Sequence, residues 1–199
     1  MRKQTIVIDR EYGSGGREVA KILSRKLEMK FYDGELLALA SERYGIDLGI
    51  MKDYDEKRMG SLLYSLAMAA HCMDDYEKLE TPYKIYNAQE KLMKQLVRES
   101  PCIFLGRCAG EILKDETPVL NVFIYGDDMQ KKIARVEAVD GISGREAESR
   151  IHKKDAERKN YYHYFTGKEW GNRKNYALCL NTSMLGYEKA ADVIIAAME

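Results

Sequence analysis

The glycine-rich segment near the start of the chain constrains its fold more than any other feature. A short run of apolar and β-branched residues, Thr5–Ile8, precedes it, and residues 10–17 read Arg-Glu-Tyr-Gly-Ser-Gly-Gly-Arg. Apolar residues then recur at helical spacing from Arg17 to Leu27. A strand, a glycine-rich turn and a helix in this order open the βαβ units from which parallel sheets are built. The start of the chain therefore predicts an α/β fold.

The same alternation continues to the end of the chain. Further strand-like runs occur at residues 31–32, 102–105, 119–125 and 176–180, and stretches of helical character separate them. Helices that alternate with strands cover both faces of a parallel sheet, and the connections are right-handed crossovers. With 199 residues, the chain has the length of one such domain. We expect a sheet of about five parallel strands.

The composition excludes several classes of protein. Hydrophobic residues make up 45% of the chain, which is enough for a packed core and excludes a mainly disordered chain. The 32 basic and 32 acidic residues balance, which argues against a partner such as duplex nucleic acid or a membrane surface. No apolar run reaches the length of about 20 residues of a membrane span, and the N-terminus does not resemble a signal peptide. We expect a cytoplasmic protein whose four cysteines are free thiols.

The balanced total hides an uneven distribution of charge. Residues 145–174 contain nine Lys and Arg against five Asp and Glu, so this segment has an excess of four positive charges. The remainder of the chain carries the matching negative excess. Two interpretations stand, namely a helix face of paired surface charges and a basic segment that closes over an anionic ligand. The polarity favours a small, multiply charged ligand over a long nucleic acid.

The glycine-rich loop is typical of a phosphate-binding site. Glycines allow successive backbone N–H groups to converge on an anion, and the following helix adds the positive end of its dipole. A tight turn that needs positive φ is the simpler alternative, but three glycines within four residues exceed that need. Neither the strict G-x-x-x-x-G-K-[ST] pattern nor a dinucleotide fingerprint is present. The expected phosphate-binding residues are Gly13, Ser14, Gly15, Gly16, Arg17 and Glu18.

Four stretches of the sequence carry a resemblance to a known family. They are IVIDREYGSGGREVAKILSRKL, FYDGELLALASERYGI, CIFLGRCAGEIL and the segment from KKDAERKN to YEKAADVI. On these stretches the chain resembles the cytidylate kinase-like proteins, relatives of the nucleoside monophosphate kinases. The resemblance implies a three-layer α/β/α P-loop kinase fold in a single domain, residues 1–199. It divides this domain into a core (1–45, 85–140 and 175–199), a helical insert (46–84) and a basic lid (141–174).

The resemblance also implies an activity, its cofactors and its substrates. Kinases of this class transfer the γ-phosphate of ATP, bound with Mg²⁺, to a nucleoside monophosphate or a similar small acceptor. Tyr32 and Asp33 lie where such kinases begin their acceptor site, and Arg107 matches the arginine of a G-R-D motif that holds the monophosphate. In the lid, Asp155 and Arg158 share a helix face, so we expect Asp155 to orient Arg158 towards the transferred phosphate.

The loop departs from the cytidylate kinase pattern, G-x-x-G-x-G-K-G-T, at four positions, and Arg17 stands at the last glycine of that pattern. Arg10 replaces the first glycine, Gly16 replaces the lysine and Glu18 replaces the threonine. The chain therefore lacks the lysine that reaches the β- and γ-phosphates and the hydroxyl that holds Mg²⁺. Arg17 is the expected replacement for the charge of that lysine, and Glu18 is a candidate magnesium ligand.

These departures keep other functions open. A degenerate member of the family would bind a nucleotide or another phosphorylated ligand as a sensor or regulator. A weaker interpretation is the binding of single-stranded RNA through the aromatic residues of segment 161–170, which otherwise pack a lid or a subunit contact. The methionines of segment 46–84 are typical of a core or of a contact between copies of the chain, so a homo-oligomer is worth testing.

Overall fold

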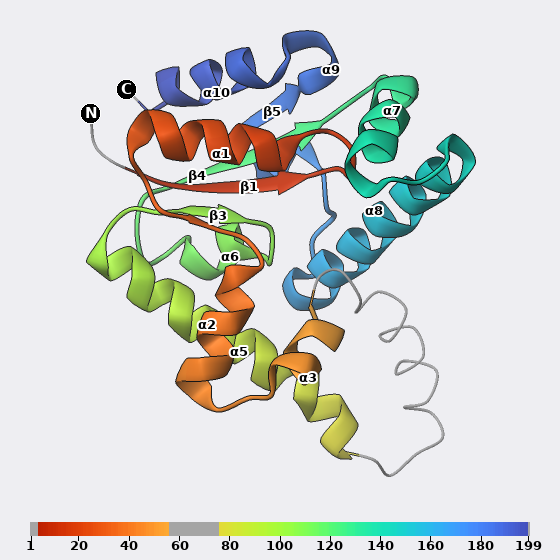
Figure 1. The fold of residues 1–199 in the computed structure, drawn as a ribbon. Coiled ribbons are helices and arrows are strands. Elements are labelled where there is room, and N and C mark those ends of the chain that lie inside the picture. The colour runs from red at the N-terminus through yellow and green to blue at the C-terminus, as the bar shows by residue number, and fades with distance from the viewer. Residues whose placement is uncertain (1–3, 56–75, 199) are drawn as a thin grey trace.

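A parallel five-stranded sheet forms the centre of the protein (Figure 1). The computed structural model describes residues 4–55 and 76–198. Neighbouring strands pair in parallel, in the order β2-β3-β1-β4-β5. The strands are β1 (Thr5–Arg10), β2 (Phe31–Tyr32), β3 (Ile103–Leu105), β4 (Val119–Tyr125) and β5 (Leu178–Asn181). The predicted α/β fold with about five parallel strands is confirmed.

Helices lie on both sides of the sheet (Figure 1). Two of them, α1 and α10, pack side by side on one face, and α2, α5 and α6 cover the other. The helices are α1 (Gly16–Leu27), α2 (Glu35–Tyr44), α3 (Leu48–Asp53), α5 (Tyr76–Glu99), α6 (Ala109–Leu113), α7 (Met129–Asp140), α8 (Gly144–Thr166), α9 (Thr182–Leu185) and α10 (Tyr187–Ala196), with a short 3₁₀ turn, η1, at Arg173–Asn175.

The central strand β1 explains why both faces must be covered. Ile6 and Ile8 belong to the buried cluster shared with α1 and α10, whereas Val7 belongs to the cluster on the opposite face. Since successive side chains of a strand point to opposite faces, the apolar run Ile6–Ile8 within β1 needs helices on each side. The resulting three-layer arrangement places the carboxyl ends of β1 and β3 side by side, and loops at that edge are the usual place for ligands in open α/β sheets.

Helix α5 begins before the expected end of the helical insert. The core is expected to resume at residue 85, but α5 extends from Tyr76 to Glu99 with Pro82 inside it. A proline removes one hydrogen bond and usually ends a helix, whereas here the buried side chains of Ile85 and Leu92 anchor α5 to the core. The helix therefore crosses the expected border between insert and core at residue 84. Residues 56–75, which make up most of the expected insert, lie outside the described residues.

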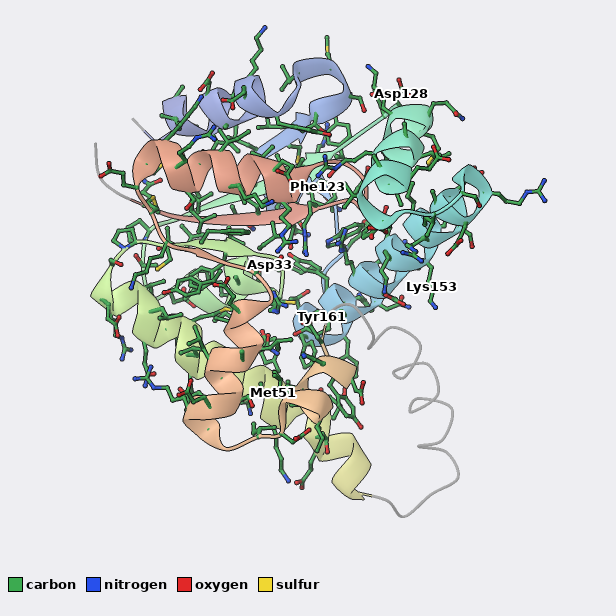
Figure 2. All side chains as sticks on the ribbon, in the orientation of Figure 1. Asp33, Met51, Phe123, Asp128, Lys153 and Tyr161 are labelled. Atoms are coloured by element: carbon green, nitrogen blue, oxygen red, sulfur yellow. The ribbon has the colours of Figure 1, made fainter. Side chains whose placement is uncertain are left out.

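Helix α8 packs beside α7, on the side of the sheet where the carboxyl end of β1 lies (Figure 1). Val136 of α7 forms a small buried cluster with Ala147 and Ile151 of α8. Further along α8, Tyr161 is buried, whereas Lys153 is exposed and points away from the body of the protein (Figure 2). Within residues 4–55 and 76–198, no helix is both long and apolar enough to cross a membrane.

Candidate functional site

A cavity of about 270 Å³ opens where the first strand ends. Its lining comes from the loop after β1, from α7, from α8 and from Asp33, which follows β2. The acidic lining residues are Glu11, Asp33 and Asp140. The basic lining residues are Arg10, Arg17, Arg135, Lys154 and Arg158. Five basic against three acidic side chains favour an anionic ligand.

The loop has the backbone conformation that glycine permits. Gly13 and Gly15 have φ of 78° and 80°, in the left-handed region that other residues rarely adopt. A Cβ atom on Gly15 would lie 2.2 Å from the ring of Tyr187 in α10, so this position also has no room for a side chain. The sequence signal of closely spaced glycines therefore reflects two separate requirements, backbone conformation and contact with the last helix.

Four residues of the loop that line the cavity have backbone N–H groups without a protein partner among the described residues. In the part of the chain that the structure describes, the N–H groups of Gly13, Gly15, Gly16 and Arg17 donate to no protein acceptor. All four residues line the cavity, and the last two begin α1, whose dipole adds positive potential at this end. Consecutive unpaired N–H groups at the start of a helix form a site for an anion, such as a phosphate group.

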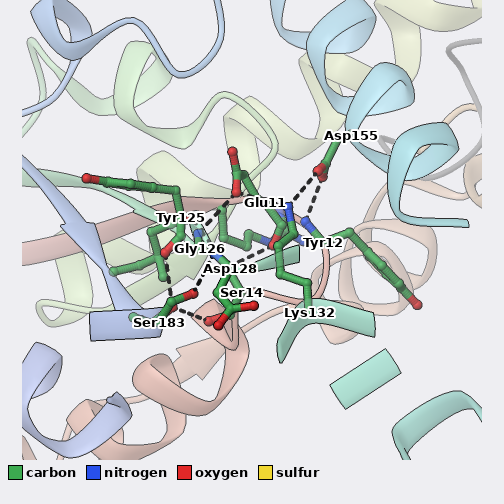
Figure 3. A network of polar contacts seen from close by, with 12 residues as sticks. Glu11, Tyr12, Ser14, Tyr125, Gly126, Asp128, Lys132, Asp155 and Ser183 are labelled. Carbon is green, nitrogen blue, oxygen red and sulfur yellow. Dashed lines mark hydrogen bonds and ion pairs between the residues drawn. The ribbon is translucent and has the colours of Figure 1, made fainter. Parts of the chain in front are cut away.

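A polar network supports the loop from the side of the sheet and α7 (Figure 3). The Oε2 atom of Glu11 accepts hydrogen bonds from the Gly126 N–H at 3.1 Å and from the Nζ of Lys132 at 3.0 Å. The Ser14 hydroxyl donates to the Glu11 carbonyl at 2.8 Å, and Thr182 donates to the Ser14 carbonyl at 2.6 Å. Ser14, one of the expected phosphate-binding residues, thus directs its hydroxyl into the loop and not into the cavity.

The two expected lid residues lie together beside the loop. Asp155 accepts a hydrogen bond from the Tyr12 N–H at 2.6 Å and lies 3.6 Å from the Nζ of Lys132 (Figure 3). Arg158 donates to the backbone carbonyl of Arg10 at 2.9 Å, and its Nη1 lies 3.6 Å from Asp155. Burial raises the pKa of Asp155, although the Tyr12 N–H and Lys132 oppose that effect.

Tyr12 itself fixes the outer wall of the cavity. Its hydroxyl donates to Asp140 of α7 at 2.6 Å, and burial raises its pKa to about 12. The guanidinium of Arg158 lies over the Tyr12 ring, 5.4 Å from its centre. The loop is therefore tied to α7 and α8 at the same residue.

Asp33, at the opposite wall of the cavity, has one oxygen without a hydrogen-bond partner. Its Oδ2 atom lies 3.0 Å from the Nε of Arg17. Within the described residues, its Oδ1 atom is buried and accepts no hydrogen bond, and the Nη1 of Arg107 lies 3.8 Å away. A buried carboxylate oxygen that lacks a partner carries a desolvation cost.

The expected acceptor clamp, Arg107, is held by carboxylates of the protein. Its Nη2 atom lies 3.0 Å from Asp55, and the Arg107 side chain is 2% exposed. Gly106, Arg107 and Cys108 are three successive residues with positive φ, a conformation that costs about 1–2 kcal/mol for each of the two that are not glycine. The surrounding contacts outweigh this strain and fix the guanidinium between Asp33 and Asp55. Arg107 does not line the cavity.

Two other expected site residues also lie away from the cavity. Tyr32 is buried and its ring stacks on Phe104, with 5.4 Å between ring centres. Glu18 is turned towards Arg135 and Lys21, with its Oε1 atom 3.3 Å from each. Among the residues with described positions, no group of three or more His, Cys, Asp or Glu side chains is arranged to hold a metal ion.

The aromatic residues near the end of α8 pack against other parts of the protein. Tyr161 and Tyr162 are buried in a cluster that includes Cys108, and Phe165 stacks on Tyr86 with 4.2 Å between ring centres. Trp170 contacts the ring of Phe123 edge-on. These contacts agree with the packing interpretation of segment 161–170.

The sequence of the chain matches a known protein family. Residues 5–184 match the sequence profile of the cytidylate kinase-like family. The chain belongs to this family. The expected resemblance is thereby confirmed over nearly the whole chain.

Solved structures place this family member among the P-loop kinases in fold. An uncharacterized protein from Eubacterium ventriosum is 25% identical, with a TM-score of 0.73 and 98% of both chains covered. Shikimate kinase from Acinetobacter baumannii, in complex with shikimate, is 12% identical, with a TM-score of 0.53 and coverage of 99% of this chain and 93% of that one. TT1252 from Thermus thermophilus is 22% identical, with a TM-score of 0.52 and both chains fully covered. No curated protein matches this chain significantly.

Several residues of the site carry no signal in the sequence. Asp55 lies outside every motif, and Lys132 is one of two adjacent lysines in a charged helix. Both reach the site only because the fold brings together positions that are 52 and 121 residues apart in the chain. Alternation of strands and helices predicts which loops meet at an edge, but not which helix residue faces that edge.

Proposed function

We propose that this member of the cytidylate kinase-like family is an ATP-dependent phosphotransferase whose cavity holds the phosphates of ATP. The observation that carries the proposal is a cavity with a surplus of basic side chains, lined by four residues, Gly13, Gly15, Gly16 and Arg17, whose N–H groups have no partner among the described residues. Such donors are fixed before the ligand arrives, so they stabilise phosphate charge without reorganisation.

The basic side chains around the loop divide into two groups in this proposal. Arg10 and Arg17 line the cavity next to the unpartnered N–H groups, on the side of Asp33. Lys154 and Arg158 reach it from α8, where Asp155 positions Arg158 against the loop. Charges supplied from two sides suit a phosphoryl group in transit between donor and acceptor. The division into core, insert and lid stays a prediction, with α8 as the part of the lid that contacts the loop.

The donor set fits a magnesium ion that arrives with ATP. Mg²⁺ usually keeps several water ligands and binds one or two carboxylates together with substrate phosphates. The carboxylates that line the cavity, Glu11, Asp33 and Asp140, already contact donors of the protein, so the ion would be held chiefly by the phosphate oxygens and by water. Glu18, the candidate from the sequence, is engaged by Arg135 and Lys21. Magnesium supplies charge neutralisation at the phosphate oxygens.

Asp33 also lies where an acceptor hydroxyl would be activated. In the transfer, the bond between the γ-phosphorus and the bridging oxygen to the β-phosphate breaks, and a bond from phosphorus to the acceptor oxygen forms. In this proposal the acceptor proton passes to the carboxylate of Asp33, directly or through one water, and ADP leaves. A carboxylate within hydrogen-bond reach of a hydroxyl is the geometry that general-base catalysis requires.

The charges around Asp33 favour an alcohol without a phosphate group of its own as the acceptor. Arg107, the residue expected to grip a monophosphate, lies between Asp33 and Asp55, and Arg17 also contacts Asp33, so the two carboxylates already balance the charges of both arginines. A monophosphate would have to displace a carboxylate from a buried ion pair, which is costly. We therefore rank small alcohols ahead of nucleoside monophosphates as acceptors.

A coupled assay of ADP release tests the function. The protein is incubated with ATP and Mg²⁺, and with a panel of nucleoside monophosphates, sugars, polyols and amino alcohols. We expect turnover with at least one alcohol and an increase of the melting temperature with ATP. Absence of turnover with every acceptor, together with absence of an ATP-induced thermal shift, would refute the proposal.

The second candidate function is a degenerate kinase that binds a phosphorylated ligand without turning it over. Gly16 in place of the lysine, and Glu18 turned away from the cavity, favour this alternative. Calorimetry separates the two functions. Tight binding of ATP without turnover of any acceptor would support the regulatory role.

A further inference from the structure

Gly16 stands where the related kinases have lysine, and the side chain of Arg10 occupies the space beside it. A Cβ atom placed on Gly16 would lie 2.5 Å from the Cβ of Arg10 and 2.9 Å from its Cγ. Real Cβ atoms essentially never approach other atoms below 3.0 Å. A side chain at position 16 and the present Arg10 therefore exclude each other.

Gly16 is not needed for the backbone of the loop. Gly13 and Gly15 have positive φ, whereas Gly16 does not and is the first residue of α1. Any residue can adopt that conformation, and glycine costs about 1 kcal/mol relative to alanine within a helix. The contact that accounts for glycine at this position is the one with Arg10, since the next nearest atom, in Ile124, is 3.5 Å away.

Arg10 is placed to act on a ligand in the cavity. It is the last residue of β1, it is 5% exposed, and it lines the cavity together with Gly15, Gly16 and Arg17. Arg158 of α8 donates to the Arg10 carbonyl, which fixes the backbone at this point. A guanidinium is always charged and presents several donors in a plane, which suits the oxygens of a phosphate group.

We propose that Arg10 replaces the missing loop lysine, so that positions 10 and 16 have exchanged their roles. In the related kinases, glycine at the position of Arg10 leaves room for lysine at the position of Gly16. Here the Arg10 side chain occupies that space beside Gly16. The inference rests on the proposed function and adds the residue that supplies charge to the β- and γ-phosphates. It also explains two departures from the family pattern by one contact.

Arg17, the replacement expected from the sequence, is less suited to this role. Its side chain is 60% exposed, and its Nε lies 3.0 Å from Asp33. Solvent screens an exposed charge, so Arg17 stabilises a bound phosphate less than a buried guanidinium does. Arg17 thus serves as the comparison residue in the test.

An exchange of residues tests the proposal. The variants are Arg10→Met, Gly16→Lys and the double variant R10G/G16K. The double variant has the residues of the related kinases at positions 10 and 16. We expect Arg10→Met to weaken ATP binding about 100-fold, in line with the loss of one fixed donor to an anion. AMP lacks the β- and γ-phosphates, so its binding should change less than threefold. Gly16→Lys alone should also bind ATP poorly, because the new side chain collides with Arg10.

The double variant provides the decisive measurement. R10G/G16K should bind ATP within tenfold of the natural protein and at least tenfold more tightly than either single variant. Arg10→Lys, which keeps the charge, should retain ATP binding within tenfold if Arg10→Met proves too unstable to assay. Arg17→Ala should weaken ATP binding less than Arg10→Met.

The results that overturn the inference differ from those that overturn the proposed function. If the natural protein neither binds ATP nor turns over any acceptor, the proposed function fails and the role of Arg10 fails with it. If the natural protein binds ATP but Arg10→Met binds it equally well, only the inference fails. The inference also fails if R10G/G16K binds ATP no better than Gly16→Lys, or if Arg10→Met weakens AMP and ATP equally.

Discussion

The two walls of the cavity use arginine in opposite ways. At the loop, Arg10 lines the cavity beside residues with unpartnered N–H groups, and Arg17 also lines it while its Nε lies 3.0 Å from Asp33. At the other wall, Arg107 lies behind Asp33, and Asp55 and Asp33 flank its guanidinium. The first arrangement offers positive charge to a ligand, and the second uses it to fix a carboxylate. An arginine in a family motif therefore indicates a ligand contact only when its guanidinium reaches the cavity.

The largest expected effect is on kcat and comes from removing the charge of Asp33 in the second wall of the cavity. Asp33→Asn should reduce kcat about 10²–10⁴-fold, because the acceptor proton loses its base, while ATP still binds at the loop. Steady-state kinetics with the best acceptor, together with calorimetry for ATP, measures both quantities. Asp140→Asn is the matched comparison at the cavity, because the Asp140 Oδ2 already accepts from Tyr12, and it should lower kcat less than tenfold. If kcat falls by less than threefold in Asp33→Asn, Asp33 is not the base and the proposed difference between the two walls is wrong.

The next largest effect should appear in stability and should separate Arg107 from surface arginines. Arg107→Met leaves Asp55 buried without the cation that contacts it and removes one of the two arginines beside Asp33, so the free energy of unfolding should fall by about 3–5 kcal/mol. Urea denaturation measures it. Arg98→Met is the control, because Arg98 is 69% exposed and pairs with Glu116 at the surface, and it should cost about 0–1 kcal/mol. Equal losses for the two variants would mean that Arg107 does not hold this wall together.

A third change tests the contact between the loop and the last helix. Gly15→Ala forces a positive φ on alanine, which costs about 1–2 kcal/mol, and also drives the new methyl group into the Tyr187 ring. Gly45→Ala meets the same conformational cost with open space around it, so the difference in unfolding free energy between the two variants isolates the collision. The double variant Gly15→Ala with Tyr187→Ala should lose that difference. If Gly15→Ala and Gly45→Ala cost the same, the ring does not constrain the loop.

The smallest effect is a pH dependence at Asp155. Burial raises the pKa of Asp155 in the folded protein, so the native state binds a proton more tightly than the unfolded state does. Its contribution to stability is therefore full below the ordinary pKa of aspartate and is lost as pH rises through the folded pKa. Asp155→Asn should be relatively more stable than the natural protein above that window, and urea denaturation from pH 4 to 7 measures the difference. Asp192→Asn, at an exposed position, should not show this trend, and the same trend in both variants would contradict the assignment.

The fold was more predictable than the site, for physical reasons. The β-branched run Thr5–Ile8, the glycines and the helical spacing after them act locally, so the strand, the loop and α1 follow from the sequence alone. Asp155 and Arg158 were also expected together, since three residues along a helix is a fixed distance. The position of Arg107 between two carboxylates depends on Asp55, which no motif marks. The conflict between Arg10 and a side chain at position 16 depends on packing in three dimensions, so the sequence shows the two substitutions but not that one contact links them.

The contact between the loop and the end of the chain has a consequence for synthesis. Thr182 donates to the Ser14 carbonyl across 168 residues, and Tyr187 packs against Gly15. The loop leaves the ribosome 168 residues before Thr182 of α9, which supports it. At about 5–20 residues per second, this separation corresponds to about 10–30 s of synthesis. A nascent chain should therefore gain its affinity for a phosphate ligand only after α9 and α10 have been made.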